Sequence, residues 1–469
     1  MVHRRYICRM NLIIWKQVII MSIIYKNRRL SSSRVILLGF LGVIILGTCL
    51  LMLPCSTAEA GGASFLDALF TATSATCVTG LVTNDTATYW SGFGKLVILC
   101  LIQIGGLGVI TIAVFITKLS GRKIGLMQRS IMQESIAAPQ MGGIVRMTGF
   151  ILKTVAAIEI IGAVAFLPAM IPEFGVLKGI WYSVFHSISS FCNAGFDLMG
   201  IKGQYSSLTS YTGNVLVNVV VMVLIVVGGI GFMTWDDVRR NRLHFGRYRM
   251  QSKVVLAVTC GLIVLPAVYF YFREFSMPAW EGMTAKERVL ASFFQSITTR
   301  TAGYNTVDLA QLTESGQMIM ILLMLIGGAP GSTAGGMKVT TFAVLFATAF
   351  AVFKRRPNAH IFGRRIPNDT AHYAATVLIL YLSLFLAGGI FISCAENMAI
   401  MPALFEAASA IATVGVTLGI TPGLCTASKI VLIILMFLGR VGGMTIVYAA
   451  LSAKHPYVSE FPQEKIMVG

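Results

Sequence analysis

The stretch FTATSATCVTG at residues 70–80 decides the fold, because a similar stretch occurs at three further places in the chain. These read FHSISSFCNAG at 185–195, FFQSITTRTAG at 293–303 and FEAASAIATVG at 405–415. Each begins with Phe and ends ten residues later with Gly, and successive glycines are separated by 115, 108 and 112 residues. A period this regular predicts four internal repeats.

A second glycine motif follows each stretch. It reads QIGGLGVIT at 103–111, VVGGIGFMT at 226–234, LIGGAPGSTAGG at 325–336 and FLGRVGGMT at 437–445. From each outer glycine to the first glycine of this inner motif there are 25, 33, 24 and 24 residues. Two landmarks that recur four times in the same order indicate duplication of one unit.

The composition predicts an all-α integral membrane protein. Hydrophobic residues make up 56% of the 469 residues and charged residues only 12%, whereas soluble domains carry roughly 25% charged residues. Several apolar runs approach the ~20 residues that a helix needs to cross a bilayer. Eight runs, the predicted main transmembrane helices, are clearest: 35–54, 96–117, 211–233, 254–272, 317–327, 340–353, 373–394 and 430–451.

The distribution of the formal net charge of +18 along the chain indicates the membrane topology. Three loops, 118–153, 234–253 and 338–370, hold 18 basic and 4 acidic residues. The alternating segments hold 8 basic and 12 acidic residues and are 55–95, 172–211, 273–316 and 395–429. Because basic loops stay in the cytoplasm, this pattern predicts a cell-membrane protein with both termini cytoplasmic. The basicity therefore requires no nucleic-acid partner.

The spacing from Phe to Gly predicts a pore loop. Ten residues form a helix of about 15 Å, half a bilayer, after which the chain must return to the surface. Irregular backbone at that depth is tolerated only inside protein or beside a water-filled cavity. Four copies around one axis supply such a cavity, and glycine at the bend permits a positive φ that turns a carbonyl toward the axis. The helix dipoles point their negative ends inward, which favours cations.

We therefore predict a carbonyl selectivity filter that binds a cation at its glycines. Its residues are Thr79, Gly80, Ala194, Gly195, Ala302, Gly303, Val414 and Gly415. The alternative reading, glycine as a close-packing position between helices, would explain one such residue. It does not explain the same residue at the same place in four repeats.

The third inner motif predicts a gate. Gly327–Gly336 holds five glycines and Pro330, so the span must be broken there and its unwound backbone offers free carbonyls. The residues proposed for the gate are Gly327, Gly328, Pro330, Gly331, Ser332, Thr333, Gly335 and Gly336. A helix contact of the GxxxG type would leave Pro330 unexplained. A phosphate loop is disfavoured because Met337 separates the last glycine from Lys338.

Two charged residues, Glu159 and Arg440, stand well inside apolar runs, where insertion costs about 2.5–3.5 kcal/mol. Arg440 occupies the fourth inner motif at the place where the first two have Gly106 and Gly229. We expect its guanidinium below the filter, as an electrostatic barrier that belongs to the gate. A guanidinium bonded to backbone carbonyls is an alternative compatible with that role. For Glu159 we expect a structural hydrogen bond to a neighbouring helix.

Polar residues flank the predicted filter on its outer side. They are Asp85, Asn193, Asp197, Asn305 and Asp308. Such groups concentrate cations at a pore mouth, or brace the loops by hydrogen bonds, and both roles remain open. His186 lies on a predicted pore helix and is expected to be packed or hydrogen-bonded.

The four pore loops resemble those of the Trk/Ktr/HKT superfamily of cation transporters. The resemblance rests on SATCVTGL (74–81), CNAGFD (192–197), TTRTAGYN (298–305) and ATVGVTLGITP (412–422). GGAPGSTAGGMK at 327–338 is similar to the Gly-rich intramembrane loop of the same family, and the likeness extends over about residues 35–455. With glycine in all four filters and without long extra helices, the chain resembles the potassium-transporting membrane subunit of bacterial Ktr systems.

The resemblance implies potassium uptake by a homodimer in membrane lipid. It also implies control by a cytoplasmic nucleotide-binding regulatory subunit of the KtrA type, and sodium dependence is common in this branch. The chain itself shows no nucleotide-binding fingerprint, so no cofactor is expected in it and nucleotide would act only through the partner. No constellation of nucleophile, base or metal ligands indicates an enzyme.

The boundaries follow from the repeats: 1–34 N-terminal interfacial segment, 35–120 repeat 1, 121–240 repeat 2, 241–356 repeat 3 with the Gly-rich loop, 357–455 repeat 4 and 456–469 cytoplasmic tail. Two alternatives stay open. One is a sodium or non-selective monovalent cation transporter of the same architecture. The other is a secondary transporter with a midplane site, although that class predicts two pseudo-symmetric halves.

Overall fold

The structure, a computed structural model, describes residues 31–59, 61–119, 124–136, 142–242, 244–442 and 445. Most of the predicted N-terminal segment 1–34 and all of the predicted tail 456–469 lie outside these residues. The predicted cytoplasmic placement of both chain ends therefore concerns segments outside the described residues.

A triplet of helices occurs four times along the described chain. The second helix of each triplet ends just before a filter glycine, and the third ends at an inner glycine motif. The triplets are α2 (Ser32–Leu51), α3 (Phe65–Cys77) and α4 (Gly92–Leu107); α7 (Ile144–Phe174), α8 (Val176–Phe191) and α9 (Val215–Gly229); α11 (Met250–Tyr269), α12 (Ala285–Thr298) and α13 (Glu314–Leu325); α15 (Asn368–Glu396), α16 (Ile400–Ile411) and α17 (Thr426–Val441). The chain is thus mostly helical, as predicted.

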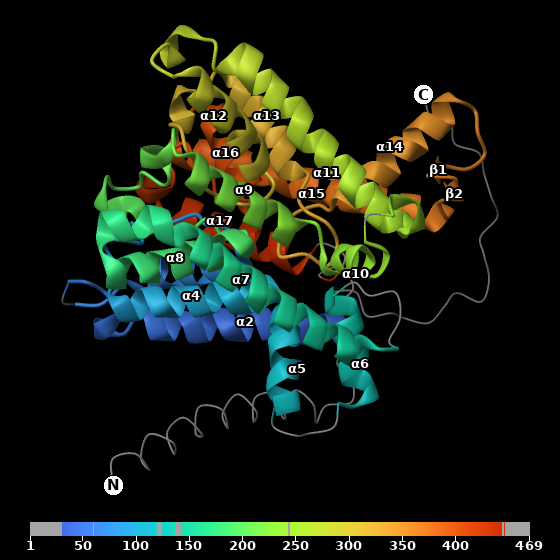
Figure 1. Cartoon of the computed structure of the whole chain (residues 1–469), viewed down its shortest axis with the longest axis horizontal. Helices are drawn as coiled ribbons and strands as arrows, with labels where there is room; N and C mark the ends of the chain where they lie inside the picture. Colours follow the sequence, from blue (N-terminus) through green and yellow to red (C-terminus); the bar gives the residue numbers. More distant parts are fainter. Residues whose placement is uncertain are drawn as a thin grey trace.

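Shorter elements connect the triplets. These are α5 (Val109–Leu119), α6 (Leu126–Ile136), α10 (Phe232–Asn241) and α14 (Val339–Phe353), with the strands β1 (His360–Ile361) and β2 (Arg364–Arg365). The strands form an antiparallel hairpin between α14 and α15, in which His360 pairs with Arg365. Figure 1 shows α14 and this hairpin projecting from one side of the helical bundle.

Among the described residues, four helices are long and apolar enough to cross a membrane by length and composition: α2, α7, α11 with its continuation to Glu274, and α15. The pair α9 and α10 gives a fifth candidate, bent by 95°. Length and composition alone do not establish the eight predicted spans. The reason is that α4, α9, α13 and α17 contain only 16, 15, 12 and 16 residues before the chain bends.

The short second helices are the most buried parts of the described chain. Every residue from Phe70 to Cys77 in α3 and from Phe405 to Ile411 in α16 is buried. A helix buried on all sides belongs to a core, and the many Ala, Ser and Thr residues here let neighbouring helices approach closely. The third repeat departs slightly from the predicted pattern. Phe293 is 39% exposed, and Phe294 takes the buried place.

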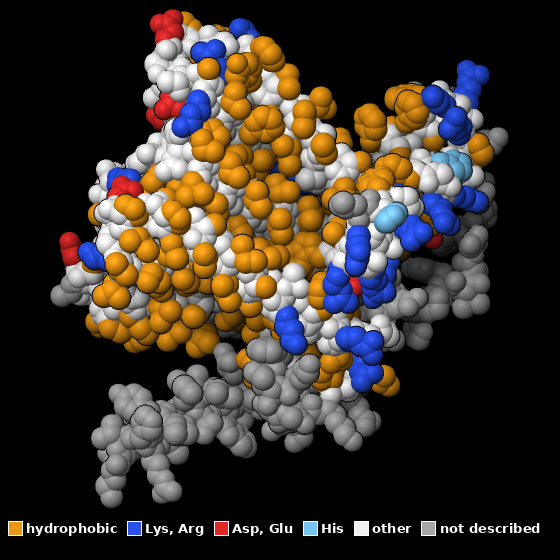
Figure 2. All heavy atoms as spheres, in the orientation of Figure 1, with side chains coloured by type: hydrophobic (Ala, Val, Ile, Leu, Met, Phe, Trp, Pro, Cys, Tyr) orange, Lys and Arg blue, Asp and Glu red, His pale blue; other side chains and the backbone are white. Residues whose placement is uncertain are grey.

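The surface divides into an apolar belt and a basic end. Large hydrophobic side chains are widely exposed, among them Leu177 at 85%, Leu265 at 74% and Phe272 at 71%. Figure 2 shows them spread over the bundle, while Lys and Arg gather beside α10 and the hairpin. Monomeric soluble proteins rarely expose so much contiguous apolar area. The belt therefore fits contact with lipid, and the basic end matches the loops predicted to be cytoplasmic.

Candidate ion pathway

The four predicted filter glycines come together from distant parts of the chain. A Cβ added to any of them would collide with the carbonyl oxygen of the residue that precedes the next filter glycine. The contacts are Gly80 with Ala194 (2.5 Å), Gly195 with Ala302 (2.7 Å), Gly303 with Val414 (2.6 Å) and Gly415 with Thr79. Because the fourth contact returns to the first segment, the four segments form a closed ring in the order of the repeats.

All four segments share an unusual backbone conformation. The filter glycines have φ values of 94°, 69°, 91° and 96°. Two residues earlier, a non-glycine residue is also left-handed in each segment: Val78 (57°), Asn193 (59°), Thr301 (66°) and Thr413 (52°). Left-handed backbone costs a non-glycine residue about 1–2 kcal/mol, so the surroundings must hold it. The sequence indicated the glycines but not these four residues, since none of them is a type that favours positive φ except Asn193.

Hydroxyl groups on the pore helices hold two of the segments in the same way. The Ser74 hydroxyl accepts a hydrogen bond from the backbone N–H of Gly80 at 3.1 Å. Ser409 accepts the matching bond from Gly415 at 2.9 Å. Both serines lie six residues before their glycine. The first and fourth repeats therefore fix the filter backbone from behind by one shared contact.

The second and third repeats use a different contact. Ser189 donates to the carbonyl oxygen of Phe196 at 2.7 Å, and the Thr298 hydroxyl donates to that of Tyr304. The hydroxyl of Tyr304, a fully buried residue, also donates to the Phe196 carbonyl at 3.1 Å. This last bond joins the second and third segments directly.

Two buried polar residues brace the chain beyond the filter. His186 contacts the Tyr182 carbonyl oxygen through Nδ1 at 2.7 Å, and its Nε2 accepts from the backbone N–H of Leu198 at 3.3 Å. The expected hydrogen-bonded role of His186 is thus confirmed. Glu406 stands at the matching place, nine residues before its glycine, and accepts from the Thr421 hydroxyl at 2.9 Å. The apolar-run criterion missed Glu406 because its pore helix is too short to form such a run.

The predicted pore-mouth residues take part in local bracing. Asp85 accepts from the backbone N–H groups of Ala87 and Thr88, both at 2.9 Å, and from that of Tyr205 at 3.1 Å. The last bond joins the outer loops of the first two repeats. The remaining four residues bond within their own loops or are buried: Asp197 with Met199, Asn305 with Val307, Asp308 with Ala310, and Asn193 fully buried.

The inner glycines let the third helices touch the ends of the pore helices. A Cβ on Gly105, Gly228 or Gly439 would collide with the carbonyl oxygen four residues before a filter glycine. The three partners are Thr76, Phe191 and Ile411, respectively. Three residues after each of these inner glycines the chain turns at a glycine of positive φ: Gly108 (86°), Gly231 (86°) and Gly442 (89°). Only glycine fits both places.

The third repeat has the Gly-rich loop at this place. The chain is non-helical from Ile326 to Lys338, so the predicted break in the span is present. At the neck of the loop, Gly327 donates to the Met337 carbonyl at 2.7 Å. Along the loop, Ala329 donates to the Gly229 carbonyl at 2.9 Å. The loop is therefore fastened both to itself and to the second repeat.

The loop carbonyls are occupied, which corrects the expectation that they are free. Lys338 donates to the carbonyl oxygens of Ala334 at 2.8 Å and Gly335 at 3.2 Å. The Gly331 carbonyl accepts from the backbone N–H of Phe232 at 2.8 Å. Arg440 donates to the carbonyl of Thr333. Basic side chains and backbone N–H groups satisfy acceptors that the broken helix leaves without partners.

Arg440 joins three elements. Its guanidinium donates to Thr333 in the loop, and to the carbonyls of Gly105 and Gly106 at the end of α4, the latter at 3.4 Å. The alternative weighed for Arg440, bonding to backbone carbonyls, is thus present. None of the four ion pairs found in the described residues includes it, so its positive charge has no acidic neighbour there.

The other predicted intramembrane charge has the expected structural contact. Gln103 of α4 donates to the Glu159 carboxylate at 3.1 Å, and Ser187 of α8 donates to the Glu159 backbone carbonyl at 2.6 Å. Glu159 therefore joins α7 to the first repeat and to its own pore helix.

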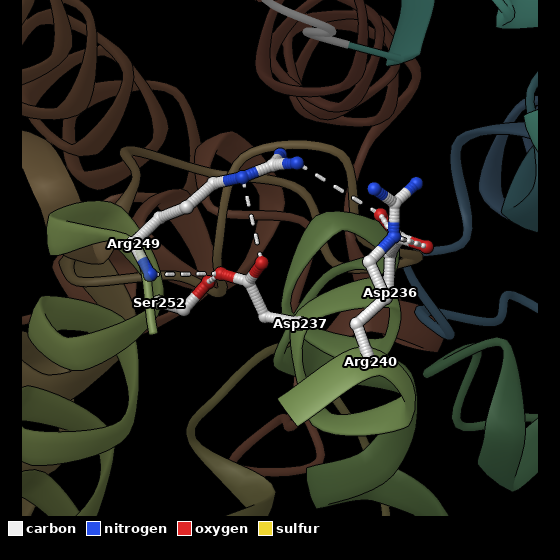
Figure 3. A network of polar contacts seen from close by, with 5 residues as sticks. All are labelled: Asp236, Asp237, Arg240, Arg249 and Ser252. Carbon is white, nitrogen blue, oxygen red and sulfur yellow. Dashed lines mark hydrogen bonds and ion pairs between the residues drawn. The ribbon is translucent and has the colours of Figure 1, made fainter. Parts of the chain in front are cut away.

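A polar network fixes the helix that follows the second inner motif (Figure 3). Asp237 of α10 accepts from the backbone N–H of Arg249 at 3.1 Å and from the Ser252 hydroxyl at 2.6 Å. It also pairs with the Arg249 side chain at 3.4 Å, while Asp236 pairs with Arg240 at 2.9 Å. This network ties α10 to the start of α11. Sequence patterns gave no sign of it, because these acids stand in a loop dominated by Arg.

Comparisons with known proteins identify the family of the chain. A family model described as "TrkH: Cation transport protein" matches residues 39–457. The potassium/sodium uptake protein NtpJ of Enterococcus hirae is 40% identical over 94% of this chain and 98% of its own length. The Ktr system potassium uptake protein B of Bacillus subtilis is 37% identical over 95% of this chain and 98% of its own length.

A solved structure supports the fold. The potassium transporter TrkH from Vibrio parahaemolyticus superposes with a TM-score of 0.69 at 20% identity, over 91% of this chain and 86% of that one. The family model and the two relatives confirm the predicted resemblance and place the chain in a family of membrane transporters and not of enzymes. The chain belongs to the TrkH family of cation transport proteins.

Proposed function

We propose that this protein takes up potassium across the cell membrane through a pore lined by four carbonyl oxygens. They belong to Thr79, Ala194, Ala302 and Val414. The observation that carries the proposal is the closed ring in which each of these oxygens lies against the filter glycine of the preceding repeat, with Thr79 closing the ring on Gly415. Carbonyl oxygens arranged in rings replace the hydration shell of a permeating ion.

The names of the relatives support the choice of ion. The Bacillus subtilis relative is described as a potassium uptake protein and the Enterococcus hirae relative as a potassium/sodium uptake protein. Potassium is therefore the substrate that we propose, bound at the filter glycines. The second candidate is sodium dependence, or transport of sodium itself. The name of the Enterococcus hirae relative, a potassium/sodium uptake protein, favours it.

We infer eight main spans in four repeats around this pore. The spans are α2, α4, α7, α9, α11, α13, α15 and α17, and the half-membrane helices between them are α3, α8, α12 and α16. The basic end, with α10 and the hairpin, faces the cytoplasm together with both termini. A secondary transporter with a midplane site explains the broken helices as well, but the ring of four similar segments supports a pore.

The gate in this proposal consists of the Gly-rich loop Gly327–Gly336 together with Arg440. Arg440 and Lys338 both bind loop carbonyls, so their charges stand beside the path that an ion takes after the filter. Two partly buried cations repel a permeating cation and hold the loop in place at the same time. Opening then requires the loop to exchange these hydrogen bonds for others.

Regulation in this proposal comes from a second polypeptide. The Bacillus subtilis relative is named as a protein of a Ktr system, and this sequence contains no nucleotide-binding fingerprint. We propose a homodimer that carries a cytoplasmic nucleotide-binding subunit on its basic end. Its signal would reach the loop through α10, since Phe232 at the start of α10 binds the Gly331 carbonyl.

Cation uptake into liposomes tests the proposal. The purified protein is reconstituted with potassium and sodium gradients applied separately, with and without the candidate regulatory subunit. Potassium uptake well above sodium uptake is the expected result. Equal uptake of both ions would support the second candidate, and uptake that requires both ions together would support sodium dependence. Absence of any cation flux under all these conditions would contradict the pore.

A further inference from the structure

We propose that Arg300 is a positioning residue that couples the third filter segment to the neck of the Gly-rich loop. Arg300 lies three residues before the filter residue Gly303. The inference rests on the proposed function and goes beyond it, since it names the contact through which loop and filter affect each other.

The contact runs from the filter turn to the first residue of the loop. Arg300 is only 6% exposed. Its Nη2 donates to the carbonyl oxygen of Gly327 at 3.2 Å and lies 3.5 Å from the Thr259 hydroxyl of α11. Its own backbone N–H donates to the Ile297 carbonyl at 3.0 Å, which holds it in the turn after α12. One residue thus has its backbone in the filter segment and its side chain on the gate.

Three cations, the buried Arg300 and the partly buried Lys338 and Arg440, bind different parts of the loop. Lys338 and Arg440 bind the carbonyls of residues 333–335, in the second half of the loop. Arg300 binds at the neck, where Gly327 and Met337 lie side by side. A movement of the loop about its neck therefore strains the Arg300 contact, whichever way the second half moves.

The other three repeats show what this contact replaces. Three residues before the filter glycine they have Cys77, Cys192 and Ala412, which are uncharged. There the first inner glycine rests directly against the end of the pore helix. In the third repeat, a Cβ on Gly327 would meet the Gly335 carbonyl of the loop, and no pore-helix atom is among its nearest neighbours. The arginine occurs in the one repeat where direct packing is lost.

The Arg300 guanidinium is incompletely satisfied, which suits a contact that changes. Its Nη1 has no hydrogen-bond partner among the described residues, and no ion pair found there includes it. It borders a small cavity whose other lining residues are Ile225, Val226, Gly229, Thr259 and Gly328. A buried donor without a partner is costly. A loop carbonyl that moved toward this space would meet the unpaired Nη1 as a second donor.

The test compares Arg300→Gln and Arg300→Lys in proteoliposomes with Lys286→Gln, an exposed position near the start of α12, as the matched control. Loss of one hydrogen bond from a charged donor predicts a rise in potassium flux of roughly tenfold or more for Arg300→Gln. It also predicts a lower ratio of potassium to sodium flux, because the third filter segment loses its anchor. Arg300→Lys keeps a donor and a charge, and a smaller change in the same direction is expected.

A second readout does not depend on flux. In a cysteine-free chain carrying Ser332→Cys, the rate of labelling by a thiol reagent from the basic side reports how mobile the loop is. We expect Arg300→Gln to raise this rate roughly threefold or more, and Lys286→Gln to leave it unchanged. A merely structural role for Arg300 would lower flux and thermal stability without raising the labelling rate.

The outcomes separate the two proposals. If the unaltered protein conducts and Arg300→Gln changes neither selectivity nor labelling, the coupling is wrong and the proposed function stands. If the unaltered protein shows no cation flux while Arg300→Gln still raises the labelling rate, the proposed function fails and the tie between Arg300 and the loop is upheld. If Arg300→Gln does not insert, Arg300→Lys takes its place, and an unchanged labelling rate there overturns the inference.

Discussion

Gly439 shows how much a single missing side chain matters beside the pore. An added Cβ would collide with the carbonyl oxygen of Ile411 and lie 3.1 Å from the Thr413 side chain. The same close contact between an inner glycine and a pore-helix carbonyl recurs at Gly105 and Gly228. The pore helix cannot give way, because its C-terminal part is buried on all sides.

We therefore expect Gly439→Ala to destabilise the protein by about 1–3 kcal/mol, the usual cost of overpacking. The measurement is the thermal unfolding midpoint of the detergent-solubilised protein. Gly423→Ala is the matched control, because an added Cβ there meets no atom within 4 Å. An unfolding midpoint unchanged from the parent in Gly439→Ala would show that the helices separate easily.

Substitution of the single residue Arg440 tests the proposed gate. Arg440→Ala removes both the charge and the bonds to Thr333 and Gly105, so potassium flux is expected to rise roughly tenfold. Arg440→Gln removes the charge but keeps a donor. Comparing the flux of the two variants therefore separates the repulsion of the permeating cation by the charge from the hydrogen bonds that hold the loop. Lower flux in both variants, with normal insertion, would exclude Arg440 from the gate.

Sequence patterns anticipated part of the residue-level picture. The filter glycines were recognisable because only glycine combines positive φ with a carbonyl against its Cα, and this requirement repeats at a fixed period. Arg300 and Glu406 were missed, since both stand in short pore-loop stretches where no apolar run draws attention to a charge. The left-handed Thr301 and Thr413 were also missed, because ring geometry imposes their conformation and residue type does not.

At the scale of elements, the helix breaks explain how the chain builds a pathway from short pieces. α4, α9 and α17 each end where a glycine of positive φ redirects the chain, and α13 ends at the Gly-rich loop. The loop was predictable from its composition. The expectation of free carbonyls was wrong, because Arg440, Lys338 and Arg300 come from three separate elements whose convergence no local pattern shows.

Shortening the loop tests its role as an element. Deletion of Ser332–Gly335 removes the carbonyls held by Arg440 and Lys338 while leaving the neck at Gly327 and Met337. We expect a potassium flux several-fold above that of the parent, measured in proteoliposomes. The potassium-to-sodium ratio serves as the internal control and should stay close to the parent value, because the deletion leaves the four filter glycines and the Arg300 contact at the neck in place. A fall in flux with normal insertion would contradict the gate.

At the scale of the whole molecule, charge sets the orientation that the pore requires. Basic residues gather at the end that carries α10 and the hairpin, and the outer loops carry most of the acids (Figure 2). The membrane-protein class could be inferred from composition, whereas the four repeats and this orientation stay predictions from period and charge. The order in which the segments close into a ring could not be inferred, because a linear repeat leaves the neighbours in space undefined.

Orientation is tested by labelling single cysteines in an otherwise cysteine-free chain in intact cells. Arg364→Cys in the hairpin and Gln204→Cys in an outer loop are both exposed positions. A membrane-impermeant thiol reagent should label Gln204→Cys from outside, and Arg364→Cys only after the membrane is opened. The reverse pattern would contradict the proposed topology.

The measurement that tests the central claim most directly is the potassium-to-sodium permeability ratio of Gly303→Ser beside Gly261→Ser. At Gly303, with a φ of 91°, the added side chain would collide with the Val414 carbonyl at 2.6 Å, whereas at Gly261 in α11 nothing lies within 4 Å. Strain of about 1–3 kcal/mol in the ring predicts a ratio roughly tenfold lower for Gly303→Ser and an unaltered ratio for Gly261→Ser. An unaltered ratio in both variants would mean that the carbonyl ring does not select the ion.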